Sequence, residues 1–170
     1  MTRGLVALAL CTVMLVAVQI TIISPLRIAG VVVMVVWLWP VSLALTGRTV
    51  VSVGAGFVTG LLFDTHSLTP FGLTGVVGVL LALAAAQLGR EGVGDLDAAA
   101  WWVTPALAAA AGFAAPLIFV ILGFLTGHTT LWRGNLGVMM VVNAVAFFVL
   151  ARPLTRLAQR VAESGGWSRT

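Results

Sequence analysis

Asp64 and His66 are the residues of this chain whose types and spacing best suit chemistry. They lie two positions apart in the stretch GFVTGLLFDTHSLTPFGLTG, residues 56–75. A carboxylate and an imidazole at this spacing could pass a proton or share a metal ion. Zinc needs three or four ligands, and the second histidine of the chain, His128, lies in a separate loop. One interpretation is a cluster of the three side chains, and the other is that His66 is simply solvated in a polar loop.

Asp64 also has a structural interpretation, which we favour. It ends one apolar segment, and only residues 65–69 separate it from the next. The carboxylate is therefore expected to lie close to the free N–H groups at the start of the second helix. A helix N-terminus carries a partial positive charge and favours an anion. Asp64 would then lock a helical hairpin, with no catalytic or metal-binding role.

The composition decides the environment of these residues. Residues of the hydrophobic set make up 61% of the 170 positions, and charged residues make up only 8%. A soluble domain of this length would expose far larger apolar patches than a monomer tolerates, so we expect an integral membrane protein. The net charge of +4 comes from arginines scattered singly between apolar runs. This pattern indicates orientation in a membrane, and we expect no nucleic-acid partner.

Six apolar segments are long enough, or nearly so, to cross a bilayer as helices. We therefore predict an all-α, polytopic membrane protein whose transmembrane domain covers residues 1–151. The first segment is expected to be an uncleaved helix. The expected spans are 4–23, 28–46, 49–63, 70–88, 105–125 and 131–151. With an even number of spans both termini share one side, which then holds seven of the nine arginines. The positive-inside rule makes that side cytoplasmic.

Proline and tryptophan mark the expected helix ends. Thr69-Pro70 and Thr104-Pro105 each place a capping residue before a proline at the first helical position. Residues 98–103, with Trp101 and Trp102, would then form a short segment at the headgroup level, which tryptophan favours. The proline at position 116 is expected to kink the fifth helix.

Small residues recur at helical spacing on two neighbouring segments. Ser52, Gly56 and Gly60 lie four apart, and Asp64 is the next position on the same face. The fourth segment repeats the pattern with the residues Gly78, Ala82 and Ala86. Close backbone contact through small residues is how helices associate in lipid. The two faces are expected to pack against each other as an antiparallel hairpin, and the alternative is that one of them receives a partner helix.

The tail, residues 152–170, carries arginines on one helix face. Arg152, Arg156 and Arg160 are four residues apart, with Leu154, Leu157 and Val161 beside them. This is the pattern of a basic amphipathic helix on an anionic cytoplasmic leaflet. A solvated extension of the sixth helix is the other interpretation.

Two amide side chains stand within the spans, Gln19 and Asn143, and each is expected to make an interhelical hydrogen bond. The sequence contains no nucleophile elbow, phosphate-binding loop, zinc-protease motif or dinucleotide fingerprint. We expect no catalysis, no cofactor and no bound metal.

The stretch GFVTGLLFD followed by TPFGLTGVVGVLLAL resembles the rod shape-determining protein MreD family. The matching residues are Gly60, Asp64, Pro70, Gly72 and Leu73. Six spans and the length of the chain agree with that family, whereas Gly75 stands where the family usually has alanine. The resemblance implies a fold similar to the membrane substrate-binding subunits of energy-coupling-factor transporters.

The resemblance also implies a function. Such proteins are non-catalytic scaffolds of the bacterial cell-elongation machinery for peptidoglycan, located in the cytoplasmic membrane. They bind the single-span protein MreC and, through it, MreB, RodA and a class B penicillin-binding protein. The fold likeness leaves a second interpretation, a vitamin-binding transporter subunit. Its ligand would contact polar residues of the outer loops, namely Asp64, His66, His128, Trp132, Arg133 and Asn135.

Overall fold

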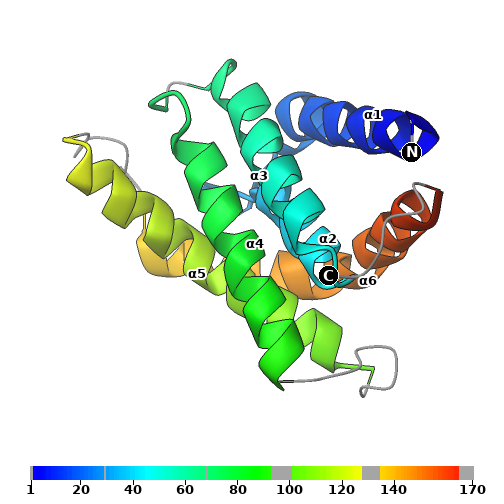
Figure 1. Ribbon diagram of the computed structural model, residues 1–170. Coiled ribbons are helices and arrows are strands. Elements are labelled where there is room, and N and C mark those ends of the chain that lie inside the picture. The colour runs from blue at the N-terminus through cyan, green and yellow to red at the C-terminus, as the bar shows by residue number, and fades with distance from the viewer. Residues whose placement is uncertain (1, 29, 68, 93–100, 128–134, 165–170) are drawn as a thin grey trace.

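The computed structural model describes residues 2–28, 30–67, 69–92, 101–127 and 135–164 (Figure 1). This part of the chain is mainly helical. Its helices are α1 (Thr2–Val18), a π-helical turn η1 (Gln19–Ile23), α2 (Val35–Ala44), α3 (Thr49–Asp64), α4 (Leu73–Gly92), α5 (Val103–Leu125) and α6 (Leu136–Ser164). Two short strands, β1 (Arg27–Ile28) and β2 (Val31–Val32), form an antiparallel hairpin.

Three helical segments of the described residues are long and apolar enough to cross a membrane. They are Arg3–Ile23, Val103–Leu125 and Leu136–Ser164. Three shorter apolar helices accompany them, which are α2, α3 and the apolar part of α4. Large apolar side chains cover much of the exterior, among them Met14, Phe57 and Phe113. Such a surface is suited to lipid.

The second expected segment, residues 28–46, differs most from the structure, because it is not one helix. The chain turns at the β1–β2 hairpin, runs extended through Val33 and Met34, and becomes helical only at Val35. Gly30 has a positive φ of 80° in the hairpin turn, where glycine is favoured. A continuous apolar run concealed this break, since hydropathy cannot distinguish a span from a buried half-helix.

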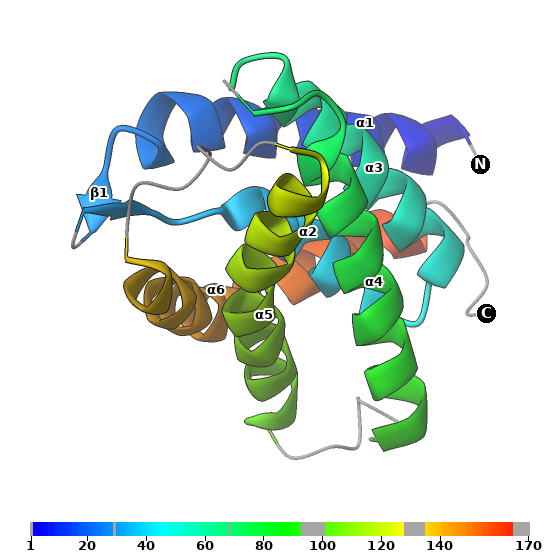
Figure 2. The same cartoon turned by 90° about the vertical axis from the view of Figure 1, so that its left-hand side faces the viewer.

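α2 forms the centre of the molecule (Figure 2). All ten of its residues are buried, and the side chains of Trp37 and Trp39 are 1% and 0% exposed. α2 contacts α3, α4, α5 and α6 as well as α1. A helix that is apolar on every side is expected in such a position. The surrounding helices thus form a shell around a short core helix.

α3 and α4 run antiparallel and lie side by side in Figures 1 and 2, so the expected hairpin is present. The expected cap residues play other parts, however. α4 begins at Leu73, three residues after Pro70, and the Thr69 hydroxyl bonds the Asp64 side chain instead of the helix backbone. α5 begins at Val103 and includes both Thr104 and Pro105, with Trp102 preceding the first turn.

α6 continues without interruption through Pro153 to Ser164, so residues 152–164 are not a separate tail. The arginines of this stretch are exposed, as a membrane-surface face requires. Its apolar side is already occupied, however, because Ala158 and Val161 are buried in a cluster with Trp39 and Leu43. Of the expected apolar face, Val161 is therefore buried and Leu154 partly buried, while Leu157 is 41% exposed. Residues 165–170 lie outside the described part of the chain.

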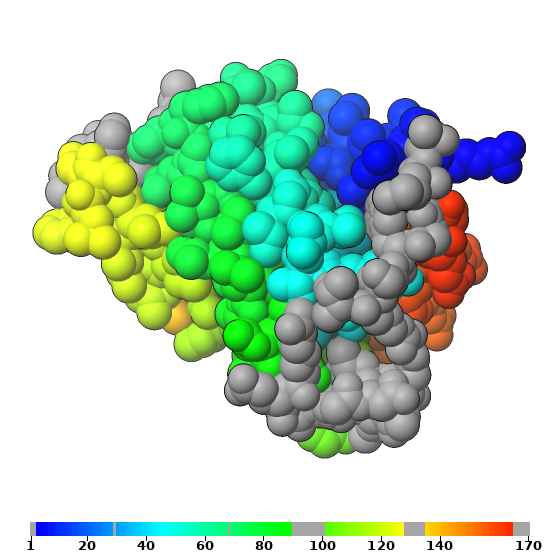
Figure 3. All heavy atoms as spheres, viewed as in Figure 1, coloured from blue at the N-terminus to red at the C-terminus, as the bar shows by residue number. Residues whose placement is uncertain are grey.

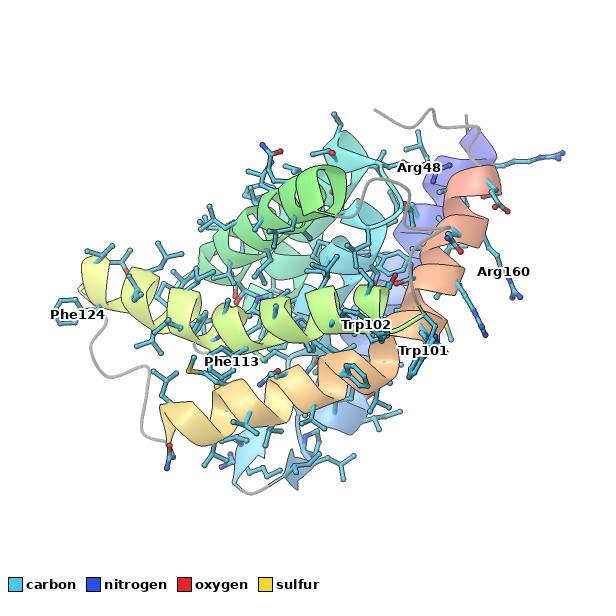
Figure 4. All side chains as sticks on the ribbon, turned by 90° about the horizontal axis from the view of Figure 1, so that it is seen from below. Arg48, Trp101, Trp102, Phe113, Phe124 and Arg160 are labelled. Carbon is cyan, nitrogen blue, oxygen red and sulfur yellow. The ribbon has the colours of Figure 1, made fainter. Side chains whose placement is uncertain are left out.

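The two ends of the described chain lie together. The start of α1 and the end of α6 are neighbours in both Figure 1 and Figure 2. Figure 4 places Arg48, Arg160, Trp101 and Trp102 toward this end, with Phe124 at the opposite end of α5. The fold therefore has one arginine-rich end, and the β1–β2 hairpin lies away from it (Figure 2).

Candidate functional site

The Asp64 carboxylate joins the end of α3 to the start of α4. Its Oδ2 accepts hydrogen bonds from the backbone N–H groups of Gly72, at 2.8 Å, and Thr74, at 3.2 Å. Its Oδ1 accepts a bond from the Thr69 hydroxyl at 2.9 Å. The side chain is only 4% exposed. Asp64 thus occupies the anion position that a helix N-terminus provides.

The loop that precedes α4 is built around this carboxylate. Since a carboxylate only accepts, Thr69 must use its single hydroxyl proton on Asp64, and Ser67 must be the donor in the bond that joins the Ser67 and Thr69 hydroxyls. Gly72 has a φ of 92°, which other residues rarely adopt. That conformation turns the Gly72 N–H toward Asp64. Each of these polar groups serves the turn between the two helices.

The His66 side chain contacts Thr65, whereas a proton relay would require it to contact Asp64. Its Nδ1 is 2.8 Å from the Thr65 hydroxyl, in an exposed position. His128 belongs to the residues outside the described part of the chain, so the three-residue cluster with Asp64 and His66 is not placed. Among the described residues, no group of three His, Cys, Asp or Glu side chains could hold a metal ion.

Glycines hold α3 against α4 just below this loop. A Cβ atom added at Gly60 would overlap the Cα and N of Gly75 and lie 2.5 Å from the Thr74 carbonyl carbon. A Cβ added at Gly56 would lie 2.9 Å from the Gly78 carbonyl group. These separations are well below van der Waals contact, so the two backbones touch where side chains are absent. In the space-filling view the surfaces of α3 and α4 adjoin (Figure 3).

The small-residue faces are therefore directed inward. Ser52, Gly56 and Gly60 are all buried, as are Gly78, Ala82 and Ala86. α2 reaches the same place, since a Cβ at Gly56 would also lie 3.1 Å from the Pro40 side chain. Of the two interpretations of these faces, internal packing is the one that the contacts show. A partner helix would have to use another surface.

A second polar cluster surrounds the start of α2. The Gln19 side chain donates to the Val33 carbonyl at 2.9 Å and accepts from the Val35 N–H at 2.8 Å. From the other side, Asn143 Oδ1 accepts the Met34 N–H at 2.8 Å. Both amide side chains are 0% exposed. They satisfy the extended backbone that enters the core, which a membrane protein tolerates only where protein groups replace water.

This cluster was the main feature that sequence reasoning missed. Gln19 and Asn143 were expected to bond between helices, and Gln19 does bond the first residue of α2, Val35, while Asn143 bonds Met34 just before that helix. The sequence did not show that the acceptors and donors would be backbone groups of an extended segment. Asn143 also donates to the Met139 carbonyl on its own helix. The turn residues Pro25 and Gly30 were a usable signal of the break, because both interrupt regular structure.

Other buried polar groups show how the core is fixed. Trp39 Nε1 donates to the Thr12 hydroxyl at 3.1 Å, which ties α2 to α1. Within the described residues, Trp37 Nε1, Ser42 Oγ and Thr74 Oγ1 are buried without a hydrogen-bond partner. Each such group has a cost of about 1–3 kcal/mol, so the apolar packing of α2 has to offset Trp37 and Ser42, and that of α4 has to offset Thr74.

The two clusters have one chemical property in common, which is that most of their hydrogen bonds go to backbone groups. Asp64 fixes the start of α4, while Gln19 and Asn143 fix the start of α2. Pro70 and Leu73 complete the turn before α4, since the Leu73 N–H donates to the Pro70 carbonyl.

A scan of protein-family models, a search of curated proteins and a search of solved structures each found no significant match to this chain.

Proposed function

We propose that this protein is a non-catalytic scaffold in the bacterial cytoplasmic membrane, where it serves cell elongation by binding an MreC-like single-span protein. The observation that supports the proposal is the assembly of the resemblance motif into one structural unit. Gly60 lies against Gly75, and Asp64 accepts the Gly72 N–H beside Pro70 and Leu73. The motif that suggests the family is thus used to build a helix junction, as a scaffold requires.

The scaffold would cross the membrane several times. Three helices are long enough to span, and α3, α4 and the α2 region complete the bundle beside them. We propose that both termini are cytoplasmic, because Arg3, Arg48 and the α6 arginines favour the inner leaflet. Contacts to MreB, RodA and a class B penicillin-binding protein would be indirect, through the MreC-like partner.

The partner helix would bind an outward face, since the glycine faces are occupied. Several described helices have exposed apolar faces, and two of them are proposed here as candidates. One lies on α3 around Val50, Gly54 and Phe57, and the other on α5 around Phe113 and Leu117. Val50 and Phe57 on the first face, and Phe113 and Leu117 on the second, are exposed and suited to apolar helix contacts.

Affinity purification of the tagged chain from native membranes tests the proposal. A single-span MreC-like protein is expected to co-purify. Gly54→Leu and Phe113→Ala alter the two exposed faces without touching the core, and loss of the partner in one of them would identify the binding face. A purified protein that retains a vitamin with nanomolar affinity would instead support the transporter-subunit function and refute the scaffold.

A further inference from the structure

The last part of α6 lies beside the first half of α1. Ala158 and Val161 of α6 are buried in a cluster against which Ala7, Leu8 and Cys11 of α1 pack. Figures 1 and 3 show the end of α6 beside the beginning of α1. The two helices run in opposite directions here, so residues 152–164 and the first turns of α1 occupy the same layer of the molecule.

Arg152 indicates where this layer lies relative to a membrane. Its guanidinium donates to the Trp101 carbonyl at 2.8 Å and lies 4.9 Å from the centre of the Trp101 ring. Trp101 and Trp102 are 69% and 53% exposed. Exposed tryptophans and arginines together are typical of the headgroup level. We therefore take Arg152 as the inner edge of the hydrocarbon.

The next two arginines of α6 support the same placement of the membrane edge. Arg156 and Arg160 are exposed and follow Arg152 at successive turns, about 6 Å apart along the helix. An arginine in the bilayer centre costs about 2.5–3.5 kcal/mol on insertion scales. Three of them on one face place residues 152–164 outside the hydrocarbon.

The first half of α1 must then also lie outside the hydrocarbon, although its surface is apolar. Leu5, Val6 and Leu10 are 55%, 57% and 65% exposed. The remainder of the first segment, residues 13–23, covers only about 16 Å at 1.5 Å per residue. That is about half of the 30 Å hydrocarbon thickness. An apolar face at the level of an arginine row is the arrangement of an interfacial amphipathic surface.

We propose that the first half of α1 and the last part of α6 form one amphipathic surface in the headgroup layer of an anionic leaflet. Leu10 lies at the boundary between headgroups and acyl chains, Leu5 and Val6 lie among the headgroups, and Arg156 and Arg160 bind lipid phosphates together with Arg152. The described residues of the two segments carry four arginines and one acid, Glu163, a net charge of 4 − 1 = +3. The inference rests on the membrane placement in the proposed function and is independent of the scaffold role.

This surface differs from the one that the sequence predicted. There, residues 152–170 alone supplied both the charge and the apolar face. In the structure Val161 packs inside the protein and Leu157 is 41% exposed, so most of the exposed apolar part comes from α1, more than 140 positions away in the chain. The two-helix surface would therefore exist only in the folded protein.

Spin-label depth measurements test the apolar half of the proposal. In a Cys11→Ser background, nitroxides are attached to Leu10→Cys on α1 and to Leu117→Cys in the middle of α5, and the full chain is placed in nanodiscs of phosphatidylcholine and phosphatidylglycerol. The Leu10→Cys label is expected at headgroup depth and the Leu117→Cys label near the bilayer centre. Equal depths of the two labels would overturn the proposal, because α1 would then be an ordinary full span.

Lipid titration tests the charged half. Arg152 is left in place, since it also bonds Trp101, and the double variant Arg156→Gln/Arg160→Gln is compared with Arg27→Gln on the β1–β2 hairpin. Each arginine near an anionic surface is worth about fivefold in affinity, so the double variant should bind phosphatidylglycerol about 25-fold more weakly by native mass spectrometry. Unchanged affinity, or an equal loss in Arg27→Gln, would refute the assignment. Loss of an MreC-like partner would affect neither experiment.

Discussion

Replacing Gly60 by alanine should separate α3 from α4. The added Cβ would overlap the Cα and N atoms of Gly75 and lie 2.5 Å from the Thr74 carbonyl carbon. All three atoms belong to backbone, so no side-chain rotation can relieve the overlap. The helices must move apart by more than 1 Å, roughly the difference from a normal carbon–carbon contact of about 3.5–4.0 Å.

The size of the effect follows from two opposing terms. Overpacking costs about 1–3 kcal/mol, and more where the backbone must shift. Alanine in place of glycine returns up to about 1 kcal/mol through helix propensity. Gly54→Ala isolates that second term, since Gly54 lies on the same helix with nothing within 4 Å of an added Cβ. We expect Gly60→Ala to be about 2–3 kcal/mol less stable than Gly54→Ala, about a 30- to 150-fold change in the unfolding equilibrium.

Reversible unfolding in mixed detergent micelles, with increasing SDS, measures this difference. Circular dichroism of both variants before unfolding confirms that each is folded at the start. Gly54→Ala should equal or exceed the original chain in stability. If Gly60→Ala were as stable as Gly54→Ala, the close backbone contact would be refuted, and the glycine face would again be available to a partner helix.

Five further substitutions, at four residues, test the polar contacts. Asp64→Ala leaves three donors unpaired and should lower the free energy of unfolding by about 3 kcal/mol, whereas Asp64→Asn keeps one acceptor and should lower it by about 1–2 kcal/mol. Melting temperatures equal to that of the original chain in both variants would contradict the capping role. Asn143→Leu leaves the Met34 N–H without its partner and should cost about 1–3 kcal/mol, with faster hydrogen exchange at residues 34 and 35; unchanged exchange would argue against the contact. His66→Gln should change stability by less than about 0.5 kcal/mol, and chelators should not shift the melting temperature; a shift would revive a metal site. Thr104→Ala should also be within about 0.5 kcal/mol, because α5 begins before it; a larger loss would restore its capping role.

The sequence predicted the periphery of this fold better than its centre. α3, α5 and the α3–α4 hairpin follow directly from apolar runs, small-residue spacing and the short loop after Asp64. The start of α4 was placed three residues early, because Thr69-Pro70 looks like a cap while Asp64 supplies the acceptor from a distance. The sequence predicted that Asp64 lies near the start of this helix, but not that Asp64 replaces Thr69 as the cap and that the helix begins at Leu73.

The α2 region shows a different limit of sequence reasoning. Residues 28–46 have the hydropathy of a span, and burial inside protein requires the same residue types as burial in lipid. The extended backbone before α2 is stable inside the core only because the side-chain amides of Gln19 and Asn143 bond to it. Likewise, Gly60 and Gly75 could be recognised as small residues, but only the structure shows that they face each other.

The burial of the short helix α2 has a consequence for how the protein is made. α2 is too short to cross a bilayer alone, since ten residues cover about 15 Å. The Met34 N–H receives its partner from Asn143, 109 positions later in the chain. The Val33 carbonyl and the Val35 N–H find their partner in Gln19, which precedes them, but the Met34 N–H has no protein partner until Asn143 has been synthesised. Biogenesis of this protein should accordingly depend on synthesis of the whole chain, with C-terminal truncations before Asn143 degraded even though most of the apolar segments are present.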